Sequence, residues 1–270
     1  MKYLKRFQTQ AQCEAYMNGS NYVEPFVGLV AETHEISYNK VVPPPLTFNI
    51  TSPGTIVWTV PYASRAKTIS YSTDSGATWT DITSTTAGTS FNVNAGDKVM
   101  FKGDNDTYAP QAFSNSFSGS TAGFEVEGNI MSLIDSTGFT TATTLTSADT
   151  FYELFMNCTG LTSAENLVLP ATTLTESCYY EMFSGCTSLT TAPELPATTL
   201  AYSCYYGMFN GCTSLNYIKC LATDISANNC TYNWARNVSS TGTFIKNPNM
   251  SSWTTGSSGI PTGWTVQDAS

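Results

Sequence analysis

The sequence has little charge and no long apolar run. Only 11% of its 270 residues are Asp, Glu, Lys or Arg, and the formal net charge is −9 with a pI of about 4.5. An acidic chain lacks the basic surface that attracts nucleic acids and anionic membranes. No stretch approaches the roughly 18 apolar residues that a membrane-spanning helix needs. We therefore expect neither a nucleic-acid partner nor membrane insertion.

The usual signatures of catalysis are also missing. His34 is the only histidine, which removes most acid–base and nucleophile-activating arrangements. The chain has no Gly-x-Ser-x-Gly elbow, P-loop, dinucleotide fingerprint or His-Glu-x-x-His motif. It also has no Cys-x-x-Cys pair of the kind that favours a zinc site. We therefore predict a non-enzymatic protein without catalytic residues, a cofactor or a metal site.

One acidic segment leaves an alternative open. Asp104 and Asp106 lie within residues 103–108, where several side-chain oxygens gather, and clustered oxygens can bind calcium. The spacing lacks the glycine and the distal glutamate of an EF-hand loop, and Asp and Asn are also common in turns. We favour a turn, with calcium binding as the alternative.

Residues 72–79 read Ser-Thr-Asp-Ser-Gly-Ala-Thr-Trp. This pattern resembles the Asp-box of sialidase-like propellers, a structural hairpin that those proteins repeat on several blades. Here it occurs once, without an arginine triad or the length of a propeller, which disfavours a glycosidase. We expect Asp74 and Gly76 to shape a β-turn, with Trp79 packed behind it.

A repeat dominates the second half of the chain. The pattern Leu-Pro-Ala-Thr-Thr-Leu, followed by Cys-Tyr-Tyr-x-Met-Phe-x-Gly-Cys-Thr-Ser-Leu, occupies residues 169–189 and returns 26 residues later. Partial copies lie upstream at residues 151–161 and downstream at residues 230–234. A period of about 20–50 residues is typical of a solenoid, in which each unit buries its apolar face against its neighbours.

Within one repeat, two patterns alternate. Leu189, Ala192 and Leu195 are three residues apart and lie among prolines, which favours a short strand over a helix. The other apolar side chains are spaced to share one face of a short helix. These are Cys178, Tyr179, Met182, Phe183 and Cys186. The predicted coil is therefore strand, turn, short helix and turn.

The repeat carries an aromatic-x-x-Cys-x-x-Leu core followed by Leu-Pro. Here these residues are Phe183, Cys186, Leu189 and Leu195–Pro196. The pattern resembles the leucine-rich repeats of BspA-like proteins, and the resemblance covers roughly residues 145–266. It implies a leucine-rich-repeat solenoid that serves as a binding scaffold on bacterial surface proteins or on phage particles.

Seven of the eight cysteines lie in the repeats and form two main rows. One row is Cys178, Cys204 and Cys230, and the other is Cys158, Cys186 and Cys212. Stacked coils about 4.7–4.9 Å apart would not forbid disulfides. Cysteine also behaves as a small buried apolar residue, and each unit needs the same plug. We therefore predict reduced, inward-facing thiols.

Residues 1–42 have the size of a small separate unit, which the prolines of Val41–Pro45 set off as a stiff linker. Strands are predicted at residues 3–7, 26–30 and 36–38, and a helix at residues 10–17. About 40 residues is at the limit of independent folding. We therefore predict a docking unit that attaches to a larger assembly.

The order Phe7, Thr9–Ala11, Glu14–Tyr16 and then Pro25–Asn39 resembles the N-terminal segments of virion proteins in crAss-like tailed phages. The resemblance implies that residues 1–42 bind other virion proteins. Residues 1–10 carry positive charge without a following apolar region, so we expect no Sec signal peptide. This favours a virion protein assembled in the bacterial cytoplasm over the alternative, a BspA-like adhesin on the bacterial cell surface.

The expected fold class is mainly β with short helices, divided into four parts. Residues 1–42 form the docking unit, and residues 46–128 form a β-sandwich, because several short strands alternate with turns. Residues 129–247 are the BspA-like repeats. Residues 248–270 form a cap in which Trp253 and Trp264 cover the open end of the solenoid.

A row of tyrosines is the candidate binding surface. The repeat places Tyr152, Tyr180, Tyr206 and Tyr232 in register on one flank. Stacking the coils would align them into an aromatic strip suited to a host-surface protein or glycan. In the alternative, the rings only shield the seam between helix and strand. We expect a phage fibre or decoration protein that forms homo-oligomers, with a trimer as one option.

Overall fold

The computed structural model describes residues 2–7, 22–30, 33–40, 43–110 and 113–270. The chain divides into two compact units, Met1–Pro43 and Pro44–Ser270. Each unit has its own sheet or sheets.

The first unit contains a three-stranded antiparallel sheet. Its strands are β1 (Lys2–Phe7), β2 (Tyr22–Val30) and β3 (Thr33–Lys40), in the order β1-β3-β2. The three strands predicted within residues 3–38 are thus confirmed. The helix predicted at residues 10–17 lies outside the described residues. The docking role of this unit stays a prediction.

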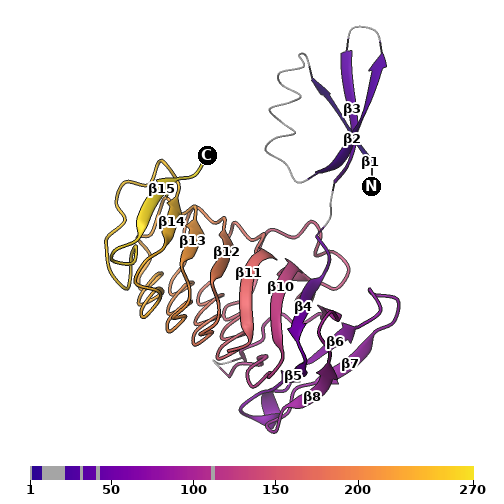
Figure 1. Cartoon of the computed structure of the whole chain (residues 1–270), viewed down its shortest axis with the longest axis vertical. Helices are drawn as coiled ribbons and strands as arrows, with labels where there is room; N and C mark the ends of the chain where they lie inside the picture. Colours follow the sequence, from indigo (N-terminus) through magenta and orange to yellow (C-terminus); the bar gives the residue numbers. More distant parts are fainter. Residues whose placement is uncertain (1, 8–21, 31–32, 41–42, 111–112) are drawn as a thin grey trace. The chain divides into compact units, whose positions relative to one another are not determined.

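The second unit is built on a ten-stranded sheet in the order β15-β14-β13-β12-β11-β10-β4-β9-β6-β7 (Figure 1). Its strands are β4 (Leu46–Ser52), β6 (Thr68–Ser72), β7 (Thr80–Thr83), β9 (Lys98–Lys102), β10 (Gly123–Asn129), β11 (Leu161–Val168), β12 (Thr191–Leu195), β13 (Tyr217–Cys220), β14 (Thr243–Lys246) and β15 (Thr265–Asp268). A separate pair joins β5 (Gly54–Trp58) to β8 (Thr89–Val93). Two short 3-10 helices are η1 (Ala63–Arg65) and η3 (Ile130–Leu133).

From β10 to β15 every neighbouring pair of strands is parallel, with one strand contributed by each coil. Figure 1 shows these strands as successive rungs of a β-solenoid of about four turns. The mainly β fold and the solenoid are thus confirmed. No helix among the described residues has the length and hydropathy to cross a membrane.

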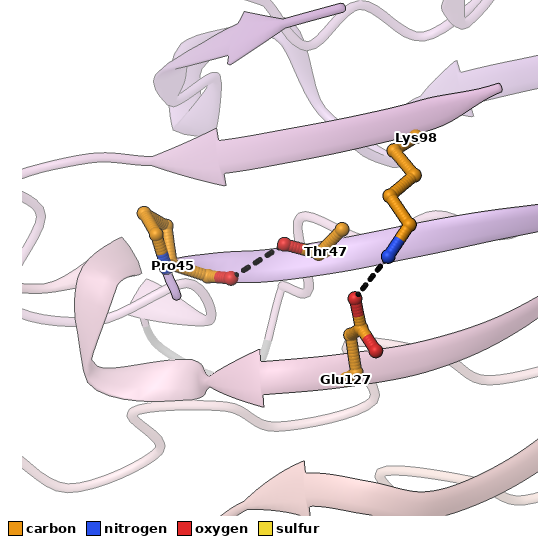
Figure 2. Close-up of polar contacts among 4 residues, drawn as sticks. All are labelled: Pro45, Thr47, Lys98 and Glu127. Carbon is orange, nitrogen blue, oxygen red and sulfur yellow. Dashed lines mark hydrogen bonds and ion pairs between the residues drawn. The ribbon is translucent and has the colours of Figure 1, made fainter. Parts of the chain in front are cut away.

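β4 joins the parallel and antiparallel parts of the sheet. It pairs antiparallel with β10 on one side and with β9 on the other. Lys98 of β9 reaches across β4 to Glu127 of β10 at 3.0 Å, and the Thr47 hydroxyl donates to the Pro45 carbonyl at 2.7 Å (Figure 2). The boundary expected after residue 128 therefore falls inside a continuous sheet. The β-sandwich stays a prediction, because β4, β9, β6 and β7 extend the solenoid sheet and only β5 and β8 form a second one.

The short helix predicted in each repeat is wrong. Residues 177–186 form a ribbon of successive turns instead, in which every fourth residue has a positive φ: Ser177 at 52°, Glu181 at 46° and Gly185 at 73°. The N–H groups alternate between two kinds of acceptor. The Met182 N–H donates within its own turn to the Tyr179 carbonyl, whereas the Phe183 N–H donates to Met208 of the next coil at 2.9 Å.

The same alternation recurs in each repeat. At each of three junctions between coils, five N–H groups of one turn ribbon donate to carbonyls of the next coil. The donors are Asp149, Phe151, Glu153, Phe155 and Asn157, then Ser177, Tyr179, Glu181, Phe183 and Gly185, then Ser203, Tyr205, Gly207, Phe209 and Gly211. Stacking therefore satisfies backbone groups that an α-helix would satisfy internally. The two structures share an inward side chain at every fourth position, so the apolar spacing alone could not separate them.

Two stacked aromatic columns run through the solenoid interior. One contains Tyr108, Phe151, Tyr179, Tyr205 and Trp234, and the other contains Phe117, Phe155, Phe183, Phe209 and Trp234. The ring centroids of neighbours lie 5.3–6.3 Å apart. Tyr108 and Phe117 precede the repeats, and their N–H groups donate to Thr150 and Leu154 at 2.9 Å. Tyr108 and Phe117 thus cover the N-terminal end of the solenoid.

The C-terminal end is covered as predicted. The Trp253 ring stacks on Trp234, with centroids 5.5 Å apart and planes 3° apart. Trp264 is buried, and its indole N–H donates to the Ser239 carbonyl at 2.8 Å. The aromatic columns therefore end against tryptophan rather than against solvent.

All seven repeat-region cysteines are buried and free. In one row, each thiol donates to a phenylalanine carbonyl of the preceding layer: Cys158 to Phe117, Cys186 to Phe155 and Cys212 to Phe183, at 3.0–3.3 Å. Burial raises the pKa of Cys178, Cys186 and Cys220 to about 12. The inward placement is confirmed, and the protonated thiols act as small plugs with a weak donor.

Candidate binding surface

The structure brings the four predicted tyrosines together in one column. The ring centroids of Tyr152 and Tyr180 lie 4.4 Å apart, those of Tyr180 and Tyr206 lie 4.5 Å apart, and the planes of each pair are within 6°. Tyr232 completes the column at 5.1 Å from Tyr206, tilted by 30°. The alignment arises because each ring occupies the same position of the turn ribbon in successive coils. We refer to these four side chains as the tyrosine column.

The stacking decides which part of each ring is accessible. Tyr152, Tyr180 and Tyr206 are half-buried, whereas Tyr232 at the last coil is 46% exposed. Parallel rings at 4.4–4.5 Å cover one another's faces. A ligand therefore meets ring edges and hydroxyl groups along the column. Stacking of a sugar on a ring face, which the sequence left open, is restricted to the ends of the column.

Two carboxylates that the sequence analysis missed lie beside the column. Glu153 and Glu181 follow Tyr152 and Tyr180 and occupy equivalent positions of neighbouring coils, both with positive φ. The Ser114 hydroxyl donates to Glu153. Burial raises the pKa of both carboxyls, and the Glu153 charge raises that of Glu181 further. Gly207 occupies the next equivalent position, so the acidic row ends there.

The same burial affects the phenol groups. Desolvation raises the pKa of Tyr152 to about 12, with a contribution from the neighbouring Glu153 charge, and it raises the pKa of Tyr180. The phenols of Tyr152 and Tyr180 are therefore neutral at physiological pH and can both donate and accept hydrogen bonds. The column presents a row of phenol hydroxyls, and carboxylates flank it at two coils.

The Asp-box segment forms a structural turn. Asp74 accepts from the Thr78 N–H at 2.9 Å, the Thr78 hydroxyl at 2.6 Å and the Ser72 hydroxyl at 2.7 Å. These hydrogen bonds, with that of the Thr78 side chain largest, lower the pKa of Asp74 to about 2. The Trp79 indole N–H donates to Gly76 at 3.0 Å, which packs the ring against the turn. The predicted β-turn role is thus confirmed.

In the segment considered for calcium binding, the first carboxylate, that of Asp104, is hydrogen-bonded within the fold. Asp104 accepts from the Ser136 N–H at 2.8 Å and from the Ser136 hydroxyl at 2.9 Å. Asn105 donates to the Thr68 carbonyl at 2.8 Å. Across the described residues, no group of three or more His, Cys, Asp or Glu side chains is arranged to hold a metal ion. Asp104 and Asn105 thus have partners within the fold, and calcium binding by Asp104 and Asp106 stays the alternative.

Comparison with known protein families, curated proteins and solved structures finds no match to this chain. The resemblances to BspA-like repeats and to virion proteins therefore rest on the sequence motifs alone.

Proposed function

We propose that the chain is a non-enzymatic structural and interaction protein of a tailed phage, a fibre or decoration protein that presents its solenoid to a host-surface protein or glycan. The observation that carries the binding role is the tyrosine column. It is a continuous row of aromatic edges and neutral hydroxyls on the surface of a rigid scaffold. Tyrosine is enriched at binding surfaces because it combines a large apolar body with one polar group.

The remaining parts follow from the sequence motifs. Residues 1–42 attach the chain to other virion proteins, residues 46–128 form a β-sandwich domain, and the leucine-rich repeats of BspA-like type project from it. Homo-oligomers, including a trimer, would present several columns and gain avidity without any new contact. This assignment places the protein in the virion.

The tyrosine column is tested by replacing Tyr180 and Tyr206 with alanine together. We expect adhesion to host cells or their surface glycans to weaken by about 1–3 kcal/mol if the two are anchors. Tyr202→Ala is the matched control, because Tyr202 is a 48% exposed tyrosine of the solenoid outside the column. A folded double variant with undiminished adhesion would move the binding site to the strand face or to the β region.

A double phenylalanine variant distinguishes ligand contacts made by the ring edges from contacts made by the hydroxyl groups. Tyr180→Phe with Tyr206→Phe keeps the stacked rings and removes two hydroxyl groups. If hydroxyls make the contacts, this variant loses adhesion as the alanine variant does. Binding through neutral groups should depend little on salt, whereas a steep salt dependence would identify the flanking Glu153 and Glu181 as the contacts of a cationic ligand.

The attachment role is tested by deleting residues 1–42. The second unit, Pro44–Ser270, contains its own sheets and core, so we expect a folded fragment that no longer joins the virion. Circular dichroism and gel filtration check the fold, and co-purification with assembled particles checks attachment. Incorporation of the truncated chain at the normal level would place the anchor elsewhere.

A further inference from the structure

The ladder of hydrogen bonds between turn ribbons stops at the last coil. The third positive-φ position of each ribbon donates its N–H to the next coil: Asn157 to Ser184 at 2.7 Å, Gly185 to Asn210 at 2.8 Å and Gly211 to Arg236 at 2.8 Å. Asn237 occupies this position in the last coil, with φ of 59°. In the described part of the chain its N–H has no hydrogen-bond partner.

The C-terminal cap replaces the missing coil only in part. Ser257 accepts from the Ala235 N–H at 3.1 Å, and the Ser258 hydroxyl accepts from the Asn233 N–H at 2.9 Å. Beyond these contacts the cap leaves an open pocket of about 260 Å³, and Asn237 forms part of its wall. The residue whose N–H would continue the ladder thus lines a pocket instead of pairing with another coil.

The other residues of the pocket are basic or neutral. Arg236 lines it, together with Ser239, Ser240, Ser257 and Thr262, and no Asp or Glu does so. Among the described residues, Arg236 forms no ion pair, whereas Lys98, Lys219 and Lys246 each do. In a chain with 20 acidic and 11 basic residues, a pocket with an unpaired arginine and no carboxylate is a locally positive site.

We propose that this pocket binds an oxyanion group, either a carboxylate or a sulfate, carried on a ligand no larger than about one sugar ring. The Arg236 guanidinium supplies charge and a planar set of donors that matches such groups. The Asn237 N–H and the hydroxyls of Ser239, Ser240 and Thr262 would supply neutral donors. The volume lies below the roughly 300–1,000 Å³ of pockets for drug-sized ligands, which sets the size of the occupant. The site does not depend on the tyrosine column.

The test is a titration of the full-length, isotope-labelled chain, followed by the amide resonances. The probes are glucuronate, inorganic sulfate and glucose, which separate an acidic sugar, the anion alone and a neutral sugar. We expect glucuronate or sulfate to shift the Asn237 amide in a saturable way, and glucose to leave it unchanged. Added sodium chloride should weaken the binding, because it screens the Arg236 charge.

Two charge variants complete the experiment. Arg236→Gln removes the cation at an exposed position, and we expect about tenfold or weaker binding of the anion. Lys219→Gln is the control, because it removes one positive charge from the same solenoid at a residue outside the pocket. Equal shifts with glucose, or unchanged anion affinity in Arg236→Gln, would overturn the proposal. Equal loss in both variants would also do so, since it would indicate a general charge effect.

Discussion

The two sides of the solenoid hold the coils together in different ways. On the turn side, each of the three junctions between turn ribbons has the same five hydrogen bonds, at 2.7–3.1 Å. On the strand side the pairing varies. β13 and β14 pair over four consecutive residues, whereas β11 and β12 share a single paired position, Ser163 with Thr191. The repeat is therefore strictest where the structure contains turns, not where it contains the sheet.

The sequence of each side fits this difference. Pro193 lies within β12 and has no N–H to donate, and the pairing of β12 with β13 shifts register between Thr191 and Glu194. On the turn side, residues 178–189 and 204–215 differ at only two positions. The turn side needs a residue with positive φ at every fourth position and an inward-facing side chain between these residues. These requirements restrict the residue types of the turn side more than pairing restricts those of a strand. We infer that the turn ribbons set the period and that the strands adapt to it.

Alkaline pH should produce the largest loss of stability, and it should act mainly on the turn side, where six of the seven buried thiols lie. The folded pKa of Cys178, Cys186 and Cys220 is raised to about 12, whereas an unfolded thiol ionises near pH ~8.5. The folded chain then keeps protons that the unfolded chain loses. The free energy of unfolding should be unaffected by these thiols below about pH 8.5, and above it should fall by up to about 1.4 kcal/mol per pH unit and thiol.

Urea unfolding at pH 8.0, 9.0 and 9.5 measures this dependence. The Cys186→Ala, Cys212→Ala variant is the control, because it should show a shallower decline even if its stability at pH 8.0 is lower. The same measurements with a thiol reagent test the predicted reduced state, since seven repeat-region thiols should react only after unfolding. A constant free energy of unfolding over this range would contradict the prediction.

Phe183→Ala should have the next largest effect. Phe183 is fully buried, and its ring lies between those of Phe155 at 5.3 Å and Phe209 at 5.7 Å. Removing it opens a cavity in the turn-side column and should lower the free energy of unfolding by about 3–5 kcal/mol. Leu195→Ala, on the strand side, removes fewer atoms and should cost less. A larger loss of unfolding free energy for Leu195→Ala would show that the strand side contributes more to stability than the turn side.

Two glycine substitutions should lower the stability by a smaller amount, and their difference should distinguish backbone strain from a steric clash. Gly185 and Gly211 have φ of 73° and 78°, so alanine should cost about 1–2 kcal/mol at either position. At Gly185 the added Cβ would also lie 2.2 Å from the Asn157 side-chain oxygen, whereas at Gly211 the nearest atom is 3.7 Å away. Gly185→Ala should therefore be the more destabilising, as measured by urea unfolding. Adding Asn157→Ala should remove the difference, and an unchanged difference would contradict this explanation.

The amino-acid sequence was sufficient to predict the solenoid, its 26-residue period, the strand of each coil, the inward cysteines and the alignment of the four tyrosines. These follow because equivalent residues of stacked coils must lie next to one another. The column of residues with positive φ also left a signal, since its positions are mostly Asn, Asp, Ser or Gly. That signal could have identified the turn ribbons, had Glu153 and Glu181 not interrupted it.

The turn ribbons, the extent of the compact unit and the pocket depend on contacts between coils and could not be predicted from the sequence. The repeats contain turn ribbons rather than the predicted helices because the N–H groups at alternate positions donate to carbonyls of another coil. The spacing of apolar residues within one coil carries no information about these acceptors. The strands that precede the repeats form one compact unit with them, because Tyr108 and Phe117 extend the aromatic columns although neither residue belongs to the repeat motif. The pocket beside Arg236 lies where a further coil would stack, and the Asn237 N–H, which would continue the ladder, has no acceptor among the described residues.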